Sequence, residues 1–177
     1  MLKVRGYDIK EPSIKDSFSR RAVKMKNDII EYLSVLGVEP HQIDLEIESV
    51  AIKNAPASVT WYFAGHKCYY SYTSLPRFID NLFIVSVIIE LEVTKLVGKE
   101  MTEEEFCRSF SEDDDVQQQR EEARKLLGVD ANEKDFEVIT KKYKLMAKEH
   151  HPDMPNGDPE LFKKINLAHK LLKRELI

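Results

Sequence analysis

The tripeptide His151-Pro152-Asp153 places the strongest local constraint on how this chain folds. A proline ring removes a backbone donor and excludes the α conformation for the residue before it. Apolar residues on both sides of the tripeptide recur at steps of three and four, which is the period of an amphipathic helix. We therefore expect an antiparallel helical hairpin with His151-Pro152-Asp153 at its tip.

The two helices of this hairpin have distinct faces. Asn132 and Asp135 are candidate N-terminal caps of the first helix. In the second helix, Asp158 is the expected N-terminal cap and Pro159 the first helical residue. The residues expected to pack are Phe136, Ile139, Tyr143, Met146 and Ala147 in the first helix, and Leu161, Phe162, Ile165, Ala168, Leu171 and Leu172 in the second. The remaining surface of the first helix carries Lys141, Lys142, Lys144 and Lys148. A third helix, ended by Gly128, is expected over residues 122–129.

The region before residue 110 has a different pattern. The helical period recurs over residues 13–36 and 76–98, and an alternating pattern indicates strands over residues 44–53, 58–63 and 68–72. The last two strands are close enough to form a hairpin. The sequence therefore predicts an α+β fold class: an N-terminal α-β-β-β-α domain with a small antiparallel sheet, followed by an all-α domain.

Charge marks the expected boundary between these parts. Residues 100–115 hold eight acidic side chains against Arg108 alone, a net charge of −7 within a chain of net charge −4. Like charges repel one another and favour a solvated segment. We expect an α+β domain over residues 1–110, an acidic linker over 111–118 and a helical domain over 119–177.

Composition excludes several classes of protein. With 27 basic and 31 acidic residues, the chain lacks the excess of Lys and Arg that general nucleic-acid binding requires. Two cysteines, Cys68 and Cys107, are too few for a disulfide framework. The longest apolar run, residues 82–89, is shorter than the roughly 20 residues that span a bilayer. The charged residues near the N-terminus leave no apolar core of the kind that a signal peptide has, so we expect no signal peptide. We expect a soluble, cytoplasmic protein that binds neither a metal nor another cofactor.

Four segments occur in an informative order: LLGV, then Lys142-Tyr143-Lys144, then His-Pro-Asp, then FKKINLAHKLL. Together they resemble the J domain of the DnaJ family over residues 122–176. The resemblance implies a non-enzymatic co-chaperone that docks on a DnaK-type ATPase chaperone and stimulates its ATP hydrolysis. For residues 1–110, which the resemblance does not cover, we expect the selection of a client protein.

The same resemblance assigns roles to individual residues. Asp153 would pair with an arginine of the chaperone, as bidentate guanidinium geometry favours, while His151 and Pro152 would fix the loop. The resemblance implies steering toward an acidic surface by Lys141, Lys142, Lys144 and Lys148, and a mixed packing and contact role for Tyr143.

The chain departs from the family pattern at two positions of this surface. Thr140 and Leu145 stand where basic residues are common, so the cationic surface is thinner. The resemblance also ends without the fourth helix of the family. We expect either weaker docking or a specialised chaperone.

Other interpretations of these residues remain open. His150, His151 and Asp153 could be metal ligands, although no other Cys or His has supporting spacing. His151 could act as a general base, although no nucleophile motif or phosphate loop accompanies it. The tripeptide could also be a simple turn, which would leave Asp153 unexplained.

The aromatic residues of the expected sheet suggest an alternative function. They are Trp61, Tyr62, Phe63, Tyr69, Tyr70 and Tyr72. Such a set could stack on single-stranded nucleic acid or bind a client peptide, although period-two aromatics are more often sheet packing. The alternative function is therefore an adaptor or nucleic-acid-binding protein with a degenerate J domain used only for protein interaction.

Overall fold

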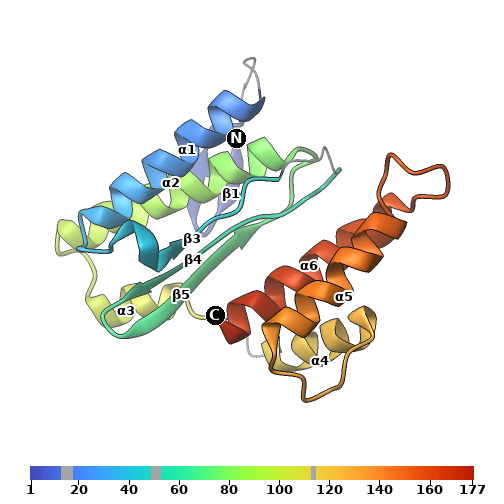
Figure 1. The fold of residues 1–177 in the computed structure, drawn as a ribbon. Helices are drawn as coiled ribbons and strands as arrows, with labels where there is room; N and C mark the ends of the chain where they lie inside the picture. Colours follow the sequence, from blue (N-terminus) through green and yellow to red (C-terminus); the bar gives the residue numbers. More distant parts are fainter. Residues whose placement is uncertain (13–17, 49–52, 113–114) are drawn as a thin grey trace. The chain divides into compact units, whose positions relative to one another are not determined.

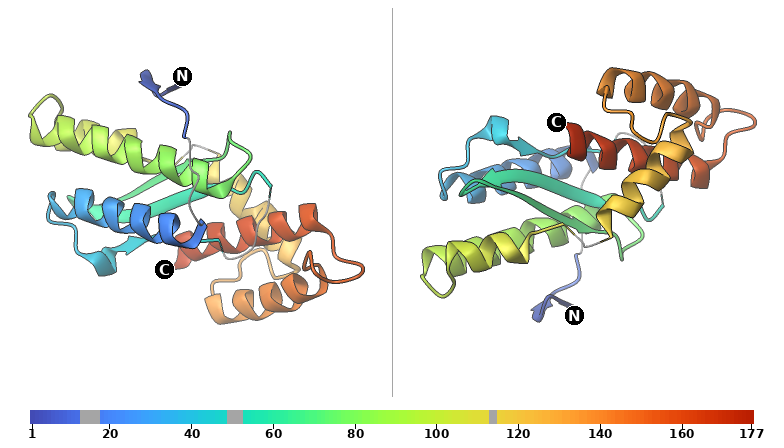
Figure 2. Two further views of the ribbon diagram at one scale, coloured as in Figure 1. Left: turned by 90° about the horizontal axis from the view of Figure 1, so that it is seen from above. Right: turned by 90° about the horizontal axis from the view of Figure 1, so that it is seen from below.

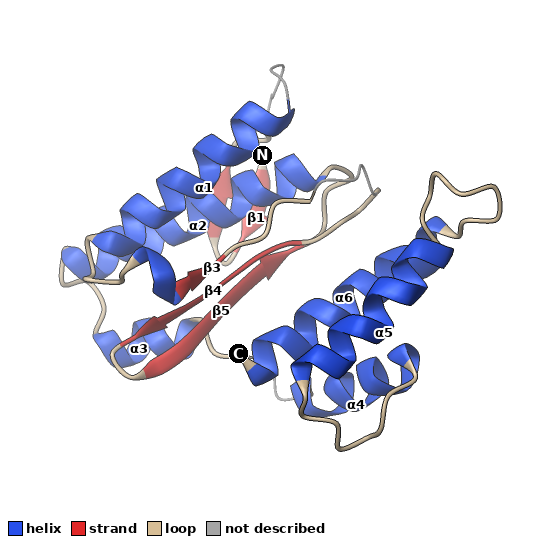
Figure 3. Cartoon of the chain, viewed as in Figure 1, coloured by secondary structure: helices blue, strands red, loops and turns tan. Residues whose placement is uncertain are grey.

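The computed structural model describes residues 1–12, 18–48, 53–112 and 115–177. The chain forms two compact units, Met1–Glu112 and Asp113–Ile177. Among the described residues, the first unit combines strands with helices, and the second contains helices alone (Figure 1; Figure 3). The expected α+β class, with an all-α region at the C-terminus, is confirmed.

A three-stranded antiparallel sheet forms the centre of the first unit, in the order β3-β4-β5. β4 (Ala57–Phe63) pairs along its whole length with β5 (His66–Tyr72), and the short β3 (Ile43–Asp44) pairs with β4. Ala64 and Gly65, between β4 and β5, have φ values of 49° and 78°. Positive φ at both central residues is what a two-residue hairpin turn between twisted strands requires.

Two long helices cover one face of this sheet. α1 (Phe18–Ser34) and α2 (Phe78–Val97) lie side by side over the strands (Figure 2). Trp61 of β4 is fully buried, with Phe110 in edge-to-face contact at a centroid distance of 4.9 Å. The alternating pattern of β4 thus separates a buried face from a polar one.

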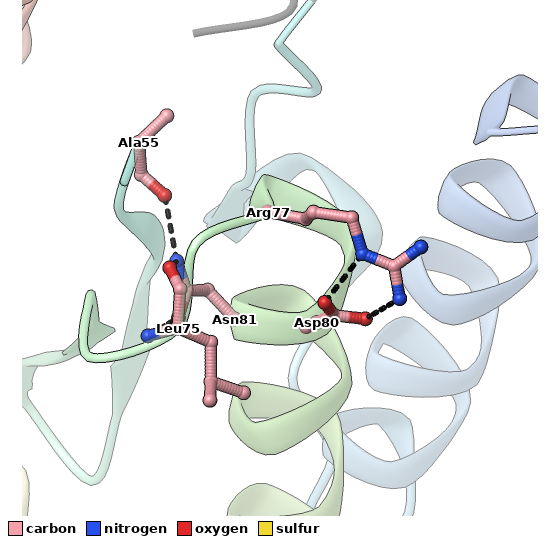
Figure 4. Close-up of polar contacts among 5 residues, drawn as sticks. All are labelled: Ala55, Leu75, Arg77, Asp80 and Asn81. Atoms are coloured by element: carbon pink, nitrogen blue, oxygen red, sulfur yellow. Dashed lines mark hydrogen bonds and ion pairs between the residues drawn. The ribbon is translucent and has the colours of Figure 1, made fainter. Parts of the chain in front are cut away.

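Asn81 fastens the first turn of α2 to the chain that precedes β4 (Figure 4). Its amide nitrogen donates to the Ala55 and Leu75 carbonyl oxygens at 2.8 and 3.0 Å, and its amide oxygen accepts from the Leu75 N–H at 2.9 Å. The side chain is fully buried. A buried amide is tolerated here because the three hydrogen bonds replace those it would make to water.

The first unit contains elements that the sequence patterns did not predict. A hairpin of β1 (Leu2–Val4) and β2 (Tyr7–Ile9) turns at Arg5 and Gly6. A short helix, α3 (Glu103–Ser109), begins with a reciprocal capping box between Thr102 and Glu105, and the hydrogen bonds from Thr102 lower the pKa of Glu105. The order β-β-α-β-β-β-α-α therefore replaces the simpler expected order.

Several expected boundaries also move. The strand expected over residues 44–53 is reduced to β3, because residues 45–48 have no strand pairing; residues 49–52 lie outside the described part. The helix expected over residues 13–36 is described from Phe18 to Ser34, and residues 13–17 lie outside the described part. Residues 116–118, which were expected within the acidic linker, belong to a helix.

The second unit packs three helices around one core. α4 (Val116–Leu127) ends at Gly128, whose φ of 64° is the left-handed conformation typical of a helix C-terminus. α5 (Phe136–Glu149) and α6 (Pro159–Leu176) form the expected hairpin. The buried core consists of Ala123, Leu127, Ile139, Ile165, Ala168 and Leu172.

Arg124 of α4 contacts both the segment before α5 and the last turn of α6. It is almost fully buried, and its guanidinium donates to the Glu133 carbonyl at 2.9 Å and to Glu175 Oε2 at 2.8 Å. A buried charge needs both an opposite charge and further hydrogen-bond partners, and Arg124 has both. This pair fixes the base of the hairpin at the end away from the loop.

Candidate docking surface

The candidate site is built on α5 and the loop that follows it. Asp135, rather than Asn132, caps α5, with its carboxylate accepting the Glu137 N–H at 2.8 Å. At the other end, the His150 N–H donates to the Met146 carbonyl oxygen, and Pro152 prevents a further helical turn. The residues that the resemblance assigned to chaperone binding are called the candidate docking surface from here on. They are Lys141, Lys142, Tyr143, Lys144, Lys148, His151, Pro152 and Asp153.

The four lysines are all exposed, but they do not form one row. Because successive helical residues are separated by about 100°, positions 141, 144 and 148 lie within about 60° of one another. Lys142 lies about 100° from Lys141, on the other side of the exposed Leu145. The structure thus groups three lysines along one line of α5 and separates the fourth from them by an apolar side chain.

In the HPD loop, residues 151–157, the His151 side chain packs against α6 while the Asp153 side chain is exposed. The His151 ring meets the buried Phe162 of α6 edge to face, with a centroid distance of 5.1 Å. Its Nδ1 accepts the Asp153 N–H at 3.2 Å and lies 3.5 Å from Asp153 Oδ2. The Asp153 side chain is 89% exposed. The carboxylate is therefore presented to solvent by a turn whose histidine is packed against α6.

Gly157 closes this loop against the backbone of His151. A Cβ atom at Gly157 would lie 2.9 Å from the His151 carbonyl carbon and 3.1 Å from the Met154 carbonyl oxygen. The Gly157 N–H donates to that same Met154 oxygen at 2.9 Å. Because backbone atoms cannot rotate away as a side chain does, the loop has this shape only with glycine at residue 157.

Tyr143 is attached to α6 and is half-buried. Its hydroxyl donates to Asn166 Oδ1 at 2.9 Å, and its ring stacks on His169 at a centroid distance of 4.0 Å. Sequence patterns did not single out His169, Asn166 or Gly157. His169 lies four residues after Ile165 and three before Leu172, so its place on the packed stripe of α6 was the available signal.

Metal binding and base stacking find little support in this geometry. Within the described ranges, no group of three or more His, Cys, Asp or Glu side chains is arranged to hold a metal ion. Trp61 is fully buried and Tyr70 is 8% exposed, so neither ring is available to stack on a base. Tyr62, by contrast, is 40% exposed on the polar face of the sheet.

Comparison with protein families matches residues 124–176 to the DnaJ domain. The matched segment contains α5, the HPD loop and α6. No curated protein and no solved structure matches the chain. Among the described residues, no helix is long and apolar enough to cross a membrane.

Proposed function

Because residues 124–176 form a DnaJ domain, and such domains act in general as partners of DnaK-type chaperones, we propose that this chain is a co-chaperone that stimulates ATP hydrolysis by such a chaperone. The single observation that supports it best is the exposed Asp153 on a loop held by Phe162 and Gly157. A carboxylate on a fixed turn is prepared to accept a bidentate hydrogen bond from an arginine. Chaperone docking through the HPD loop follows as the proposed mechanism.

The lysines of α5 contribute to the encounter rather than to the final contact. Exposed charges in high dielectric contribute little to affinity, but they raise the association rate toward a surface of opposite sign. Lys141, Lys144 and Lys148 form the row that would meet an acidic surface of the chaperone. In this proposal the chain accelerates ATP hydrolysis by its partner and hydrolyses no ATP itself.

Residues 1–110 are proposed to select the client. This part has its own core and a polar sheet face with the exposed Tyr62. A test is to identify the proteins that co-purify with the full chain and with its Tyr62→Ser and Asp153→Asn variants. We expect Tyr62→Ser to weaken client capture and Asp153→Asn to leave it unchanged; the reverse result would contradict this division of roles.

The docking proposal is tested by steady-state ATPase measurement with a DnaK-type chaperone. We expect stimulation by the wild-type chain, no ATPase activity of the chain alone, and loss of stimulation in Asp153→Asn. Asp8→Asn is a matched control because Asp8 is an exposed aspartate of the first unit. Stimulation that survives Asp153→Asn would contradict docking through Asp153. No stimulation by the wild-type chain would instead favour an adaptor in which the DnaJ domain only binds other proteins.

A further inference from the structure

His169 lies between two aromatic rings of α5. Its ring stacks on Tyr143 with an interplanar angle of 14° and on Phe136 with an interplanar angle of 26° at a centroid distance of 5.1 Å. Phe136 and Tyr143 are seven residues apart, which is about two helical turns on the same face. Two nearly parallel rings cannot share one face of the imidazole, so His169 is inserted between them.

Polar contacts fix the orientation of this ring stack. His169 Nε2 lies 3.1 Å from Thr140 Oγ1, which is on α5 between the two aromatic residues. The Tyr143 hydroxyl donates to Asn166, which is itself 9% exposed and one turn before His169 on α6. Tyr143 is thus held by α6 through both its ring and its hydroxyl.

From this arrangement we infer that His169 is a positioning residue for Tyr143 on the candidate docking surface, an inference that rests on the function proposed above. Tyr143 lies one residue from Lys142 and Lys144 and eight residues before His151. A side chain that is ordered before binding loses less conformational freedom when the complex forms. His169 therefore favours docking without itself touching the chaperone.

A merely structural role for His169 predicts a different outcome. Any half-buried residue of α6 contributes to the stability of the helical unit, and its truncation would lower the unfolding temperature. A positioning role predicts in addition that docking weakens although the unit stays folded. It also predicts rescue by an aromatic residue of similar shape, because stacking on Tyr143 needs a flat ring and not an imidazole.

The test uses the full chain with His169→Ala, His169→Phe and, as a matched control, Leu171→Ala. Leu171 is also a half-buried residue of α6 that packs against the core of this unit. Stimulation of a DnaK-type ATPase is measured against co-chaperone concentration, at a temperature where all variants are folded. The half-saturating concentration and the maximal stimulation are then compared.

We expect His169→Ala to raise the half-saturating concentration about three- to tenfold with unchanged maximal stimulation. His169→Phe should remain within about twofold of the wild type, as should Leu171→Ala. The nuclear magnetic resonance signals of the Tyr143 ring protons should shift in His169→Ala, because the ring current of the stacked imidazole is lost. An unchanged half-saturating concentration in His169→Ala, or a defect equal to that of Leu171→Ala, would overturn the inference alone. A wild-type chain without any stimulation would overturn the proposed function, and the inference with it.

Discussion

Gly157 is the residue on which the shape of the HPD loop depends most directly. We predict that Gly157→Ala displaces the His151 backbone, because the new methyl group would meet the His151 and Met154 carbonyl groups. Forcing a methyl group into a closed site costs about 1 to 3 kcal/mol. Thermal unfolding of the full chain should report a cost of this order, and ATPase stimulation should fall more than it does in a variant of similar stability.

Asn156→Ala provides the control for Gly157→Ala. Asn156 is the exposed neighbour of Gly157 in the same loop, and its truncation introduces no new atom near His151. We expect this variant to behave as the wild type in both measurements. Equal stimulation by Gly157→Ala and Asn156→Ala would contradict the account of loop closure.

A second prediction at the scale of single residues concerns the contribution of Asn81 to the stability of the first unit. Asn81→Leu keeps the side-chain volume but removes the partners of the Leu75 backbone groups and of the Ala55 carbonyl. Each buried polar group left without a partner costs about 1 to 3 kcal/mol. Urea unfolding followed by the fluorescence of Trp61 should show a loss of at least that size, while Asn27→Leu on the exposed surface of α1 should show almost none.

At the scale of elements, the distribution of lysines around α5 leads to a prediction about salt. Lys144→Ala and Lys148→Ala should each raise the half-saturating concentration about two- to fivefold at low salt, through slower association. The effect should shrink as salt rises from about 0.05 to about 0.5 M, because screening then acts over a few ångströms. Lys134→Ala, before the start of α5, is the control; an effect independent of salt would contradict electrostatic steering.

The elements that the sequence predicts well are those in which the apolar pattern repeats over several turns. α5 and α6 each present several turns of apolar spacing, and Pro152 fixes the break between them. β1 and β2 have three residues each, too few for an alternation to stand out, although Arg5-Gly6 is a usable turn signal. α3 was hidden in the acidic run, where Thr102 and Glu105 form a capping box that the charge pattern obscured.

The residues of the candidate docking surface could be predicted from the sequence, whereas the residues that support them could not. The exposure of the lysines and of Asp153 follows from their places on a helix and a turn, so those residues could be selected from the sequence. The contacts of His169 with Tyr143 and of Gly157 with His151 depend on how two helices are rotated about their axes and on the path of a loop. No local pattern specifies either, so these supporting residues required the structure.

At the scale of the whole molecule, the first unit should lose stability as the pH becomes alkaline. Burial raises the pKa of the Cys68 thiol to about 12, with a further contribution from Cys107. Burial likewise raises the pKa of Tyr70 to about 12. Both groups bind their protons more tightly in the folded first unit than in the unfolded chain, where their pKa values are about 8.5 and 10.

The sign of the effect follows from these pKa values. The stability that the protonated groups contribute is fully present below about pH 8.5 and is lost as pH rises toward 12, by about 1.4 kcal/mol per pH unit for each titrating group. Urea unfolding followed by Trp61 fluorescence at about pH 8 and about pH 10 measures this loss. The double variant Cys68→Ala, Tyr70→Phe should lose less stability over the same interval. An equal decline in both proteins would show that other groups cause it.

The central claim is that the exposed Asp153 of the DnaJ domain controls ATP hydrolysis by a DnaK-type chaperone. The most direct measurement is the rate of ATP hydrolysis by that chaperone at increasing concentrations of the wild-type, Asp153→Asn and Asp8→Asn chains. The account predicts saturable stimulation by the wild-type and Asp8→Asn chains, and a loss of more than about tenfold in the apparent affinity of Asp153→Asn, the size expected for a charge-assisted hydrogen bond. Equal curves for all three proteins, or no stimulation by any of them, would contradict it.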